Sequence, residues 1–229
     1  KEQYPETDII EFPINLGFAG GNNAGFQSTA NKADYTIFLN NDTVVDPYFV
    51  EPLINELESE SNTKQTAPKI YYADKPETIW FAGGVVNLWI GMIRHIGIRK
   101  KDSHDYSKNR VIDYATGCCV CMRTEEFESI GMFDESFFMY GEDLDFCHRI
   151  KQIGYNIIYN PITSIIHYKG ESAKTAPYDM IQLFYIAFHK YYKKYSDQYP
   201  SWKLLHFIVS FGISIRKILA YLKIYSTRI

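Results

Sequence analysis

The chain has 229 residues, of which 46% are hydrophobic and 22% are charged. This composition is ordinary for a globular protein, and the length suffices for one large domain or for one domain with an appendage. The net charge is −3, and we expect no nucleic-acid partner.

The charge is distributed unevenly along the chain. Residues 1–185 carry 16 Lys or Arg and 26 Asp or Glu, a net charge of −10, whereas residues 186–229 carry 8 Lys or Arg and one acid, a net charge of +7. An acidic body with a basic, aromatic tail indicates a tail that meets an anionic surface. We therefore divide the chain into a body, residues 1–175, and a helical extension, residues 176–229.

The N-terminal part of the body begins with a predicted strand at residues 9–14, and a glycine-rich loop leads from it into a helix near residues 22–32. Glycines allow backbone amides to approach a ligand closely. We therefore expect ligand contacts in this loop. The candidates are Asn15, Gly17, Gly20, Gly21, Asn22 and Asn23.

An apolar run at Tyr35–Leu39 follows and is typical of a buried strand in a parallel sheet. Asp46-Pro47 then predicts the start of a helix. Such βα alternation favours an α/β fold, with a mixed, mostly parallel sheet flanked by helices. Asn40, Asn41 and Asp42 follow the strand, where ligands bind in open α/β sheets. The Asp42 carboxylate can hold Mg²⁺ or Mn²⁺, or these residues form only a turn.

The middle of the chain has weaker patterns. We expect strands at residues 67–72 and 114–122, a hairpin within residues 79–98, a mobile polar loop at residues 100–109 and a helix at residues 125–130. Gly117, inside a predicted strand, indicates a close backbone approach, and it is a further candidate for a ligand contact. Trp80 is a candidate for contact with a substrate. The cysteines predict buried free thiols in a reducing, cytoplasmic compartment; they are Cys118, Cys119, Cys121 and Cys147.

Three carboxylates stand at the start of a predicted helix, Glu142–Ile153. The helix dipole stabilises acidic side chains at this end of a helix, and this effect is enough to explain one or two of them. Asp145 has its own partner in Arg149, four residues on. Asp143 or Glu142 is therefore the candidate catalytic base.

Strands are next expected at residues 156–159 and 163–166, and His167 follows the second. A lone histidine is more often packed or solvent-facing than a ligand, and its pairing with Asp42 requires the two strand ends to converge. From residue 178 the pattern is helical. The apolar run in the last helix, residues 202–225, is too short to span a bilayer. It fits a helix in the membrane interface or one packed against the body or another subunit.

Several motifs, in this order, resemble those of family 2 glycosyltransferases, and especially of the rhamnosyltransferase-like bacterial branch. The resemblance covers about residues 9–172. The motifs are Asn15 to Asn23, Phe38 to Asp42, Gly131 to Glu135, Tyr140 to Asp145, and Arg149.

This resemblance implies a GT-A fold and an inverting transfer of a sugar from a nucleotide-diphosphate donor to a glycan or lipid-linked acceptor. Asp42 matches the last acid of the family's metal motif, with Asn40 where the first acid usually stands. Asp143 matches the general base, and His167 matches a metal ligand of some relatives. Asp134 and Glu135 match a turn near the acceptor site.

Nothing in the sequence matches the family's first nucleotide-binding strands, so we expect Lys1 to lie well inside the family pattern and the activity of this stretch alone to be in doubt. Two other functions compete with transfer. One is a glycan- or nucleotide-binding module without catalysis. The other is a glycoside hydrolase, which needs facing carboxylates but neither a metal nor a diphosphate site. The glycine loop and the strand end at Asp42 favour the transferase.

Overall fold

The computed structural model describes residues 7–29, 33–168, 177–198 and 202–226. The helices are α1 (Gly17–Thr29), α2 (Val50–Ser59), α3 (Thr124–Ser129), α4 (Glu142–Gln152), α6 (Pro177–Tyr195) and α7 (Trp202–Ser226). The strands are β1 (Tyr35–Leu39), β2 (Thr43–Val45), β3 (Thr63–Tyr72), β4 (Lys75–Phe81), β5 (Gly84–Asn87), β6 (Met92–His95), β7 (Arg110–Val111), β8 (Cys119–Arg123) and β9 (Asn156–His167).

A seven-stranded mixed sheet forms the centre, in the order β1-β8-β3-β9-β2, with β4 beside β3 and β7 beside β9. Among the described strand pairs only β3–β9 is parallel. The predicted layers are correct, but the prediction of a mostly parallel sheet is wrong for these residues. The reason is that a strand buried on both faces is apolar throughout, whatever the direction of its neighbours.

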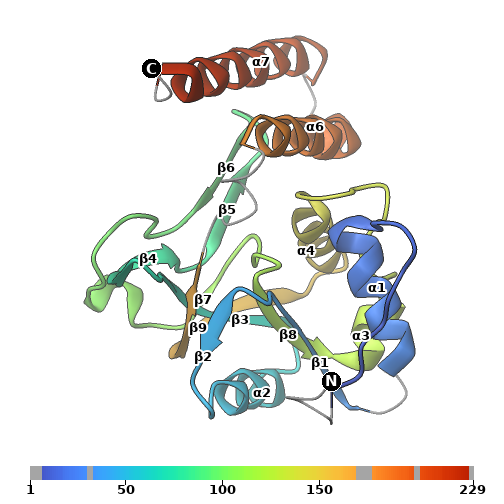
Figure 1. Cartoon of the computed structure of the whole chain (residues 1–229), viewed down its shortest axis with the longest axis vertical. Coiled ribbons are helices and arrows are strands. Elements are labelled where there is room, and N and C mark those ends of the chain that lie inside the picture. The colour runs from blue at the N-terminus through green and yellow to red at the C-terminus, as the bar shows by residue number, and fades with distance from the viewer. Residues whose placement is uncertain (1–6, 30–32, 169–176, 199–201, 227–229) are drawn as a thin grey trace.

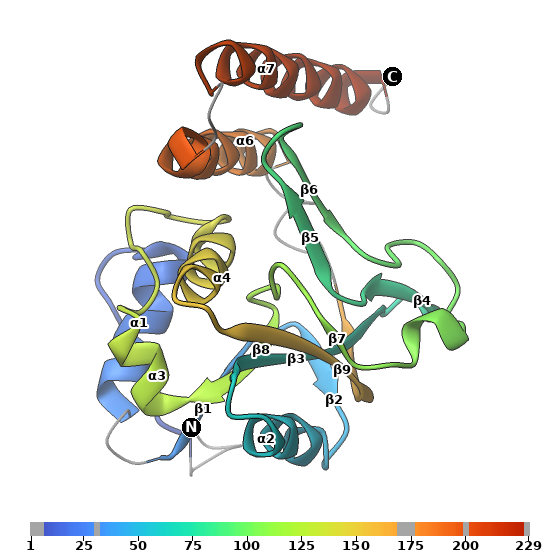
Figure 2. The same cartoon turned by 180° about the vertical axis from the view of Figure 1, so that it is seen from behind.

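The two ends of the molecule are built differently (Figures 1 and 2). Helix α2 lies at one end, and α6 and α7 lie at the other, against the tip of the β5–β6 hairpin. Buried residues of α6, including Phe188 and Tyr191, belong to the same hydrophobic core as the sheet. The boundary we drew at residue 175 therefore does not separate two cores, and it stays a prediction about function.

Several predicted boundaries were displaced. Residues 7–16 form no regular strand, and α1 begins at Gly17, so most of the expected glycine-rich loop is helix. Helix α2 begins at Val50, because Asp46 forms a turn in which its carboxylate accepts the Tyr48 N–H at 2.8 Å.

The C-terminal half of the body holds further differences. Pro161 sits at a register shift within one continuous strand, β9, and not between two strands. Residues 100–109 are ordered by a short 3₁₀ helix (His104–Tyr106) and by a bridge between Lys101 and Thr78. The predicted hairpin is confirmed as β5–β6 and the predicted α4 helix starts at Glu142 as expected.

Candidate active site

Asp42 and His167 meet where β2 and β9 run side by side. Thr43 is the register partner of His167 in this antiparallel pair, and Tyr168 donates its N–H to the Asp42 carbonyl at 2.9 Å. The strands thereby bring His167 Nε2 within 3.1 Å of Asp42 Oδ1. The two strand ends therefore converge, as the predicted pairing of His167 with Asp42 required.

The geometry of this pair fits two ligands of one divalent cation. Asp42 Oδ1 is buried and accepts no hydrogen bond from the described residues. Octahedral ligands at roughly 2.1 Å from a metal, at right angles, would themselves lie about 3 Å apart. The described residues include no group of three or more His, Cys, Asp or Glu suited to a metal, so the remaining ligands would come from water and substrate phosphates, as is usual for Mg²⁺.

Trp80 holds the His167 ring in place. The two rings meet edge to face with centroids 4.5 Å apart. The imidazole ring of His95 also meets the Trp80 ring edge to face, with centroids 4.9 Å apart. Trp80 is only 6% exposed. In the structure, Trp80 thus orients the histidine. The predicted contact of Trp80 with an acceptor stays a prediction.

Asp143 is fixed by backbone donors on both oxygens. Oδ2 accepts the Gly117 N–H at 3.1 Å, and Oδ1 accepts the Leu144 N–H at 2.8 Å. A Cβ at Gly117 would lie 2.9 Å from the Phe18 ring and 3.8 Å from Asp143 Cβ. The close approach predicted at Gly117 is therefore confirmed, and what approaches it is protein.

The loop before β8 links Asp143 to Asp42. Gly117 binds Asp143, and the next residue, Cys118, accepts the Asn40 N–H on its carbonyl at 2.9 Å. Burial raises the pKa of the Cys118 thiol, and the nearby charges of Cys119 and Asp42 raise it further. The two residues of this loop therefore bind Asp143 on one side and, on the other, Asn40, which lies two residues before Asp42.

Two adjacent carboxylates at the start of α4 have different environments. Glu142 is 4% exposed, and its Oε2 has no hydrogen-bond partner in the described part of the chain. Burial, and then the charge of Asp143, raise the pKa of Glu142 well above its usual value. Asp143 is half-buried; burial raises its pKa as well, but the backbone N–H bonds oppose the rise. The two environments thus favour the neutral form of Glu142 more than that of Asp143, a difference that environment can impose on two neighbouring carboxyls.

The turn before α4 aims these carboxylates. Tyr140 and Gly141 have φ values of 67° and 89°. A non-glycine residue in this left-handed region is strained and persists where the surroundings enforce it. The strained turn lies directly before Glu142, at the predicted catalytic position.

Among the residues predicted to contact a donor, Asn15, Asn22 and Asn23 bind other groups of the protein. Asn15 caps the α1 start by accepting the Gly17 N–H at 2.8 Å, and Asn22 donates to the Phe18 carbonyl at 2.8 Å. Asn23 is buried, and its amide joins α1 to the segment that follows α3. The amide donates to the Phe133 carbonyl at 2.9 Å and to the Glu135 carboxylate at 3.0 Å. Side chains of this segment therefore hold protein elements together. Gly20 and Gly21 lie within α1, and Asn41 is exposed beside Asp42.

The predicted acceptor turn is tied to α6. Asp134 accepts from the Ser136 N–H and from Lys194 Nζ, both at 2.9 Å. Partial burial alone would raise the pKa of Asp134, but the hydrogen bonds from Ser136 and Lys194 outweigh it and lower the pKa to about 2. Lys194 also reaches Asp145, which is fully buried and accepts the Tyr195 hydroxyl at 2.7 Å and Arg149 Nε at 2.9 Å.

The pairing of Asp145 with Arg149 was predicted correctly, whereas its contacts with Lys194 and Tyr195 were not predicted. Residues four apart on a helix are neighbours by geometry, whereas Lys194 comes 49 residues later. The surplus of acids at the start of α4 was the one available signal.

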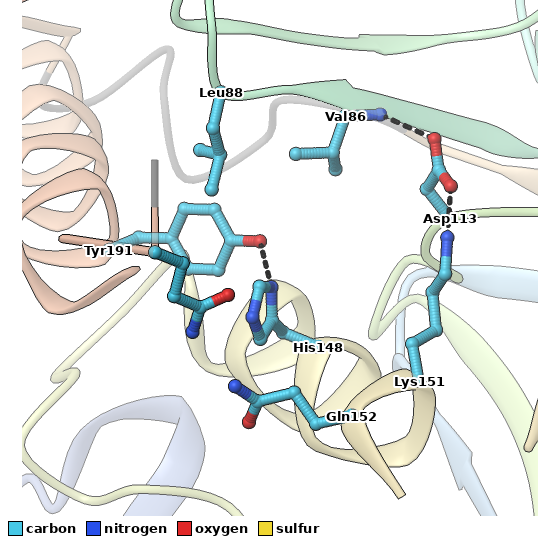
Figure 3. A pocket seen from close by; sticks show the side chains of 8 residues that line it. Val86, Leu88, Asp113, His148, Lys151, Gln152 and Tyr191 are labelled. Carbon is cyan, nitrogen blue, oxygen red and sulfur yellow. Dashed lines mark hydrogen bonds and ion pairs between the residues drawn. The ribbon is translucent and has the colours of Figure 1, made fainter. Parts of the chain in front are cut away.

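A separate hollow of about 250 Å³ lies between β5, the C-terminal half of α4 and α6 (Figure 3). Its polar groups bind one another: Lys151 pairs with Asp113, and the Tyr191 hydroxyl lies 3.1 Å from His148 Nδ1. Lys151 is eight residues after Asp143, about 12 Å along the helix. This hollow is distinct from the region around residues 117 and 118, and it contains none of the predicted site residues.

Comparison with known proteins gives one family match. The family model described as Glycosyl transferase family 2 matches residues 1–131. The hexosyltransferase Agl10 of low-salt glycan biosynthesis in Haloferax volcanii is 26% identical over 174 residues, which are 72% of this chain and 52% of that protein. The rhamnosyltransferase WbbL of Escherichia coli is 25% identical over 181 residues, 73% of this chain and 66% of that protein.

A further relative matches over a shorter stretch, and a solved structure is similar in fold. An N-acetylglucosaminyl-diphospho-decaprenol L-rhamnosyltransferase of Mycobacterium tuberculosis is 34% identical over 68 residues, 30% of this chain and 22% of that protein. The structure of GalNAc-T7 with UDP, GalNAc and Mn²⁺ aligns with a TM-score of 0.54 at 17% identity, covering 69% of this chain and 31% of that one. This likeness confirms the predicted GT-A fold. The chain spans about half the length of Agl10.

Proposed function

Because the chain belongs to glycosyltransferase family 2, we propose that it carries out an inverting, metal-dependent transfer of a sugar from a nucleotide-diphosphate donor to a hydroxyl group. The acceptor is a glycan or a lipid-linked glycan, in the synthesis of a bacterial cell-surface polysaccharide. The observation that carries this proposal is the 3.1 Å approach of His167 Nε2 to Asp42 Oδ1, beside a loop that binds Asp143 through Gly117 and Asn40 through Cys118.

Asp143 acts as the general base in this proposal. One carboxylate oxygen takes the proton of the acceptor hydroxyl, the freed oxygen forms a bond to the anomeric carbon, and the bond from that carbon to the diphosphate breaks. The electron pair leaves with the diphosphate. A pKa raised by burial makes a carboxylate a stronger base, and a positioned base is worth roughly 10²–10⁴-fold in rate.

Asp42 and His167 would hold the Mg²⁺ or Mn²⁺ ion. The 3.1 Å separation of Oδ1 and Nε2 and the burial of Oδ1 support this assignment. The bound ion would supply positive charge to the departing diphosphate. Trp80 and the strand pair β2–β9 keep the histidine in place before the substrate arrives.

Two further observations support the setting of the reaction. All four cysteines are buried and free, as expected in a reducing compartment, and we place the reaction on the cytoplasmic side of the membrane. The M. tuberculosis relative is named for N-acetylglucosaminyl-diphospho-decaprenol, which supports a lipid-linked acceptor here.

The test compares three variants of the full-length protein, with membranes present, in a screen of nucleotide sugars. Asp143→Asn is expected to lower kcat by roughly 10²–10⁴-fold while binding of the nucleoside diphosphate persists. His167→Ala is expected to weaken Mn²⁺-dependent binding of the nucleoside diphosphate. Asp74→Asn, on an exposed turn, is the matched control and keeps wild-type kinetics.

The outcomes separate the competing functions. An Asp143→Asn enzyme that turns over within tenfold of the wild type contradicts the base assignment. A protein that binds a nucleoside diphosphate with Mn²⁺ but makes no product with any donor is a binding module. Release of free sugar from a glycan without a nucleotide identifies a hydrolase.

A further inference from the structure

Helix α7 carries a continuous apolar stripe on its exposed side. Eight large apolar side chains of the helix are between 41% and 71% exposed. They are Leu204, Phe207, Ile208, Phe211, Ile215, Ile218, Leu219 and Leu222. Successive members are one, three or four residues apart, the spacing of a single helical face. From Leu204 to Leu222 the stripe is about 27 Å long, well beyond the scattered exposure that is normal on a protein surface.

The opposite side of α7 is docked on the body. Val209 and Ile213 are 5% and 0% exposed, and a Cβ at Gly91, in the β5–β6 turn, would lie 2.3 Å from Val209. Arg216 donates to the Gly91 carbonyl at 3.1 Å. At 100° per residue, Ile213 is half a turn around the helix from Leu204 and Leu222. The stripe therefore faces away from the body, on the outermost helix at that end (Figures 1 and 2).

Positive charge accompanies the stripe. Residues 198–229 contain five Lys or Arg and no Asp or Glu, whereas residues 1–185 have a net charge of −10. By helical angle, Arg216 and Lys217 lie on the two flanks, between the stripe and the docked side. A second copy joined stripe to stripe would bring these cations together with no acid between them. An anionic lipid surface complements them.

We propose that α7 is an interfacial membrane anchor, which lies in the plane of a bilayer containing anionic lipids with the stripe sunk among the acyl chains. An apolar face flanked by lysine and arginine is the pattern of such helices. No described helix is long and apolar enough to cross a membrane. The anchor stands on α7 alone and does not depend on the transfer chemistry.

Vesicle flotation tests the anchor with the full chain. Wild-type protein is expected to float with vesicles of phosphatidylcholine mixed with phosphatidylglycerol, and less with pure phosphatidylcholine. The double variant Phe211→Gln, Ile218→Gln is expected to lose more than tenfold in partitioning, because each change removes a large apolar group from the bilayer. Lys217→Gln is expected to lose roughly fivefold on the mixed vesicles only.

Two controls make the result specific. Ile162→Gln changes an apolar side chain in β9 that is 76% exposed, away from α7, and should float like the wild type. Asp143→Asn should also float normally, which separates anchoring from catalysis. Circular dichroism of each variant verifies folding.

Three results would overturn the proposal. The first is a wild-type protein that stays with the soluble fraction. The second is an Ile162→Gln loss as large as that of the α7 double variant. The third is a wild-type dimer in light scattering that the double variant converts to monomer, because the stripe would then be covered by a second copy.

Discussion

The junction of α6 with α4 rests on Asp145, and Asp145→Asn is expected to weaken it strongly. The side chain is fully buried and accepts hydrogen bonds from Arg149, Lys194 and Tyr195. Asparagine has nearly the same shape, so the change removes the negative charge without opening a cavity. It also places a donor NH₂ group where one carboxylate oxygen accepted hydrogen bonds.

The expected cost is about 3 kcal/mol, at the lower end of the 3–5 kcal/mol lost when one partner of a buried ion pair is removed. The lower end applies because Arg149 and Lys194 are 22% and 38% exposed and each keeps another acceptor. Arg149 still binds the Ile130 and Met132 carbonyls at 2.5 Å, and Lys194 still binds Asp134. For a chain of this size the loss corresponds to about 6–12 °C in Tm.

Urea and thermal unfolding followed by circular dichroism measure this loss. Lys151→Met is the matched control on the same helix: its ion pair with Asp113 joins side chains that are 42% and 32% exposed, and such pairs contribute less than about 1 kcal/mol. If Asp145→Asn costs no more than Lys151→Met, the buried carboxylate does not hold α6 in place and the reasoning is refuted.

Two other predictions concern stability. Burial raises the pKa of Glu142, so its protonated form favours the folded state; that contribution is complete below the pKa of an unfolded Glu and is lost as the pH rises through the folded value. Glu142→Gln is therefore expected to raise the urea midpoint at neutral pH and to have no effect in acid, and an effect that is equal at both pH values would contradict this. Gly17 has a φ of 73°, and its added Cβ would lie 2.1 Å from the Phe138 carbonyl oxygen, whereas a Cβ at Gly25 meets nothing within 4 Å. Gly17→Ala is expected to lower the free energy of unfolding by more than about 1 kcal/mol, and Gly25→Ala to raise it by roughly 0.5–1 kcal/mol. Equal unfolding midpoints for the two variants would show that the different surroundings of the two glycines do not affect stability.

Local features of the sequence were read correctly where the interactions are local. The start of α4 and its Asp145–Arg149 pair follow from residues less than two turns apart. The β5–β6 hairpin follows from closely spaced glycines. The start of α1 was placed too late because its glycines indicated a loop. Gly17 is in fact required by the Phe138 carbonyl, more than a hundred residues away in the chain.

The sequence by itself determined which chemical groups the chain offers: the order of the motifs, the carboxylates at 42 and 143, the histidine at 167 and the apolar, basic last helix. The tertiary structure decided which groups meet. The antiparallel pairing of β2 with β9 brought His167 to Asp42, and the packing of α6 gave Asp145 two partners that no local pattern predicted. The physical reason is that the position of a distant partner is fixed by the burial of the entire core, to which every element contributes.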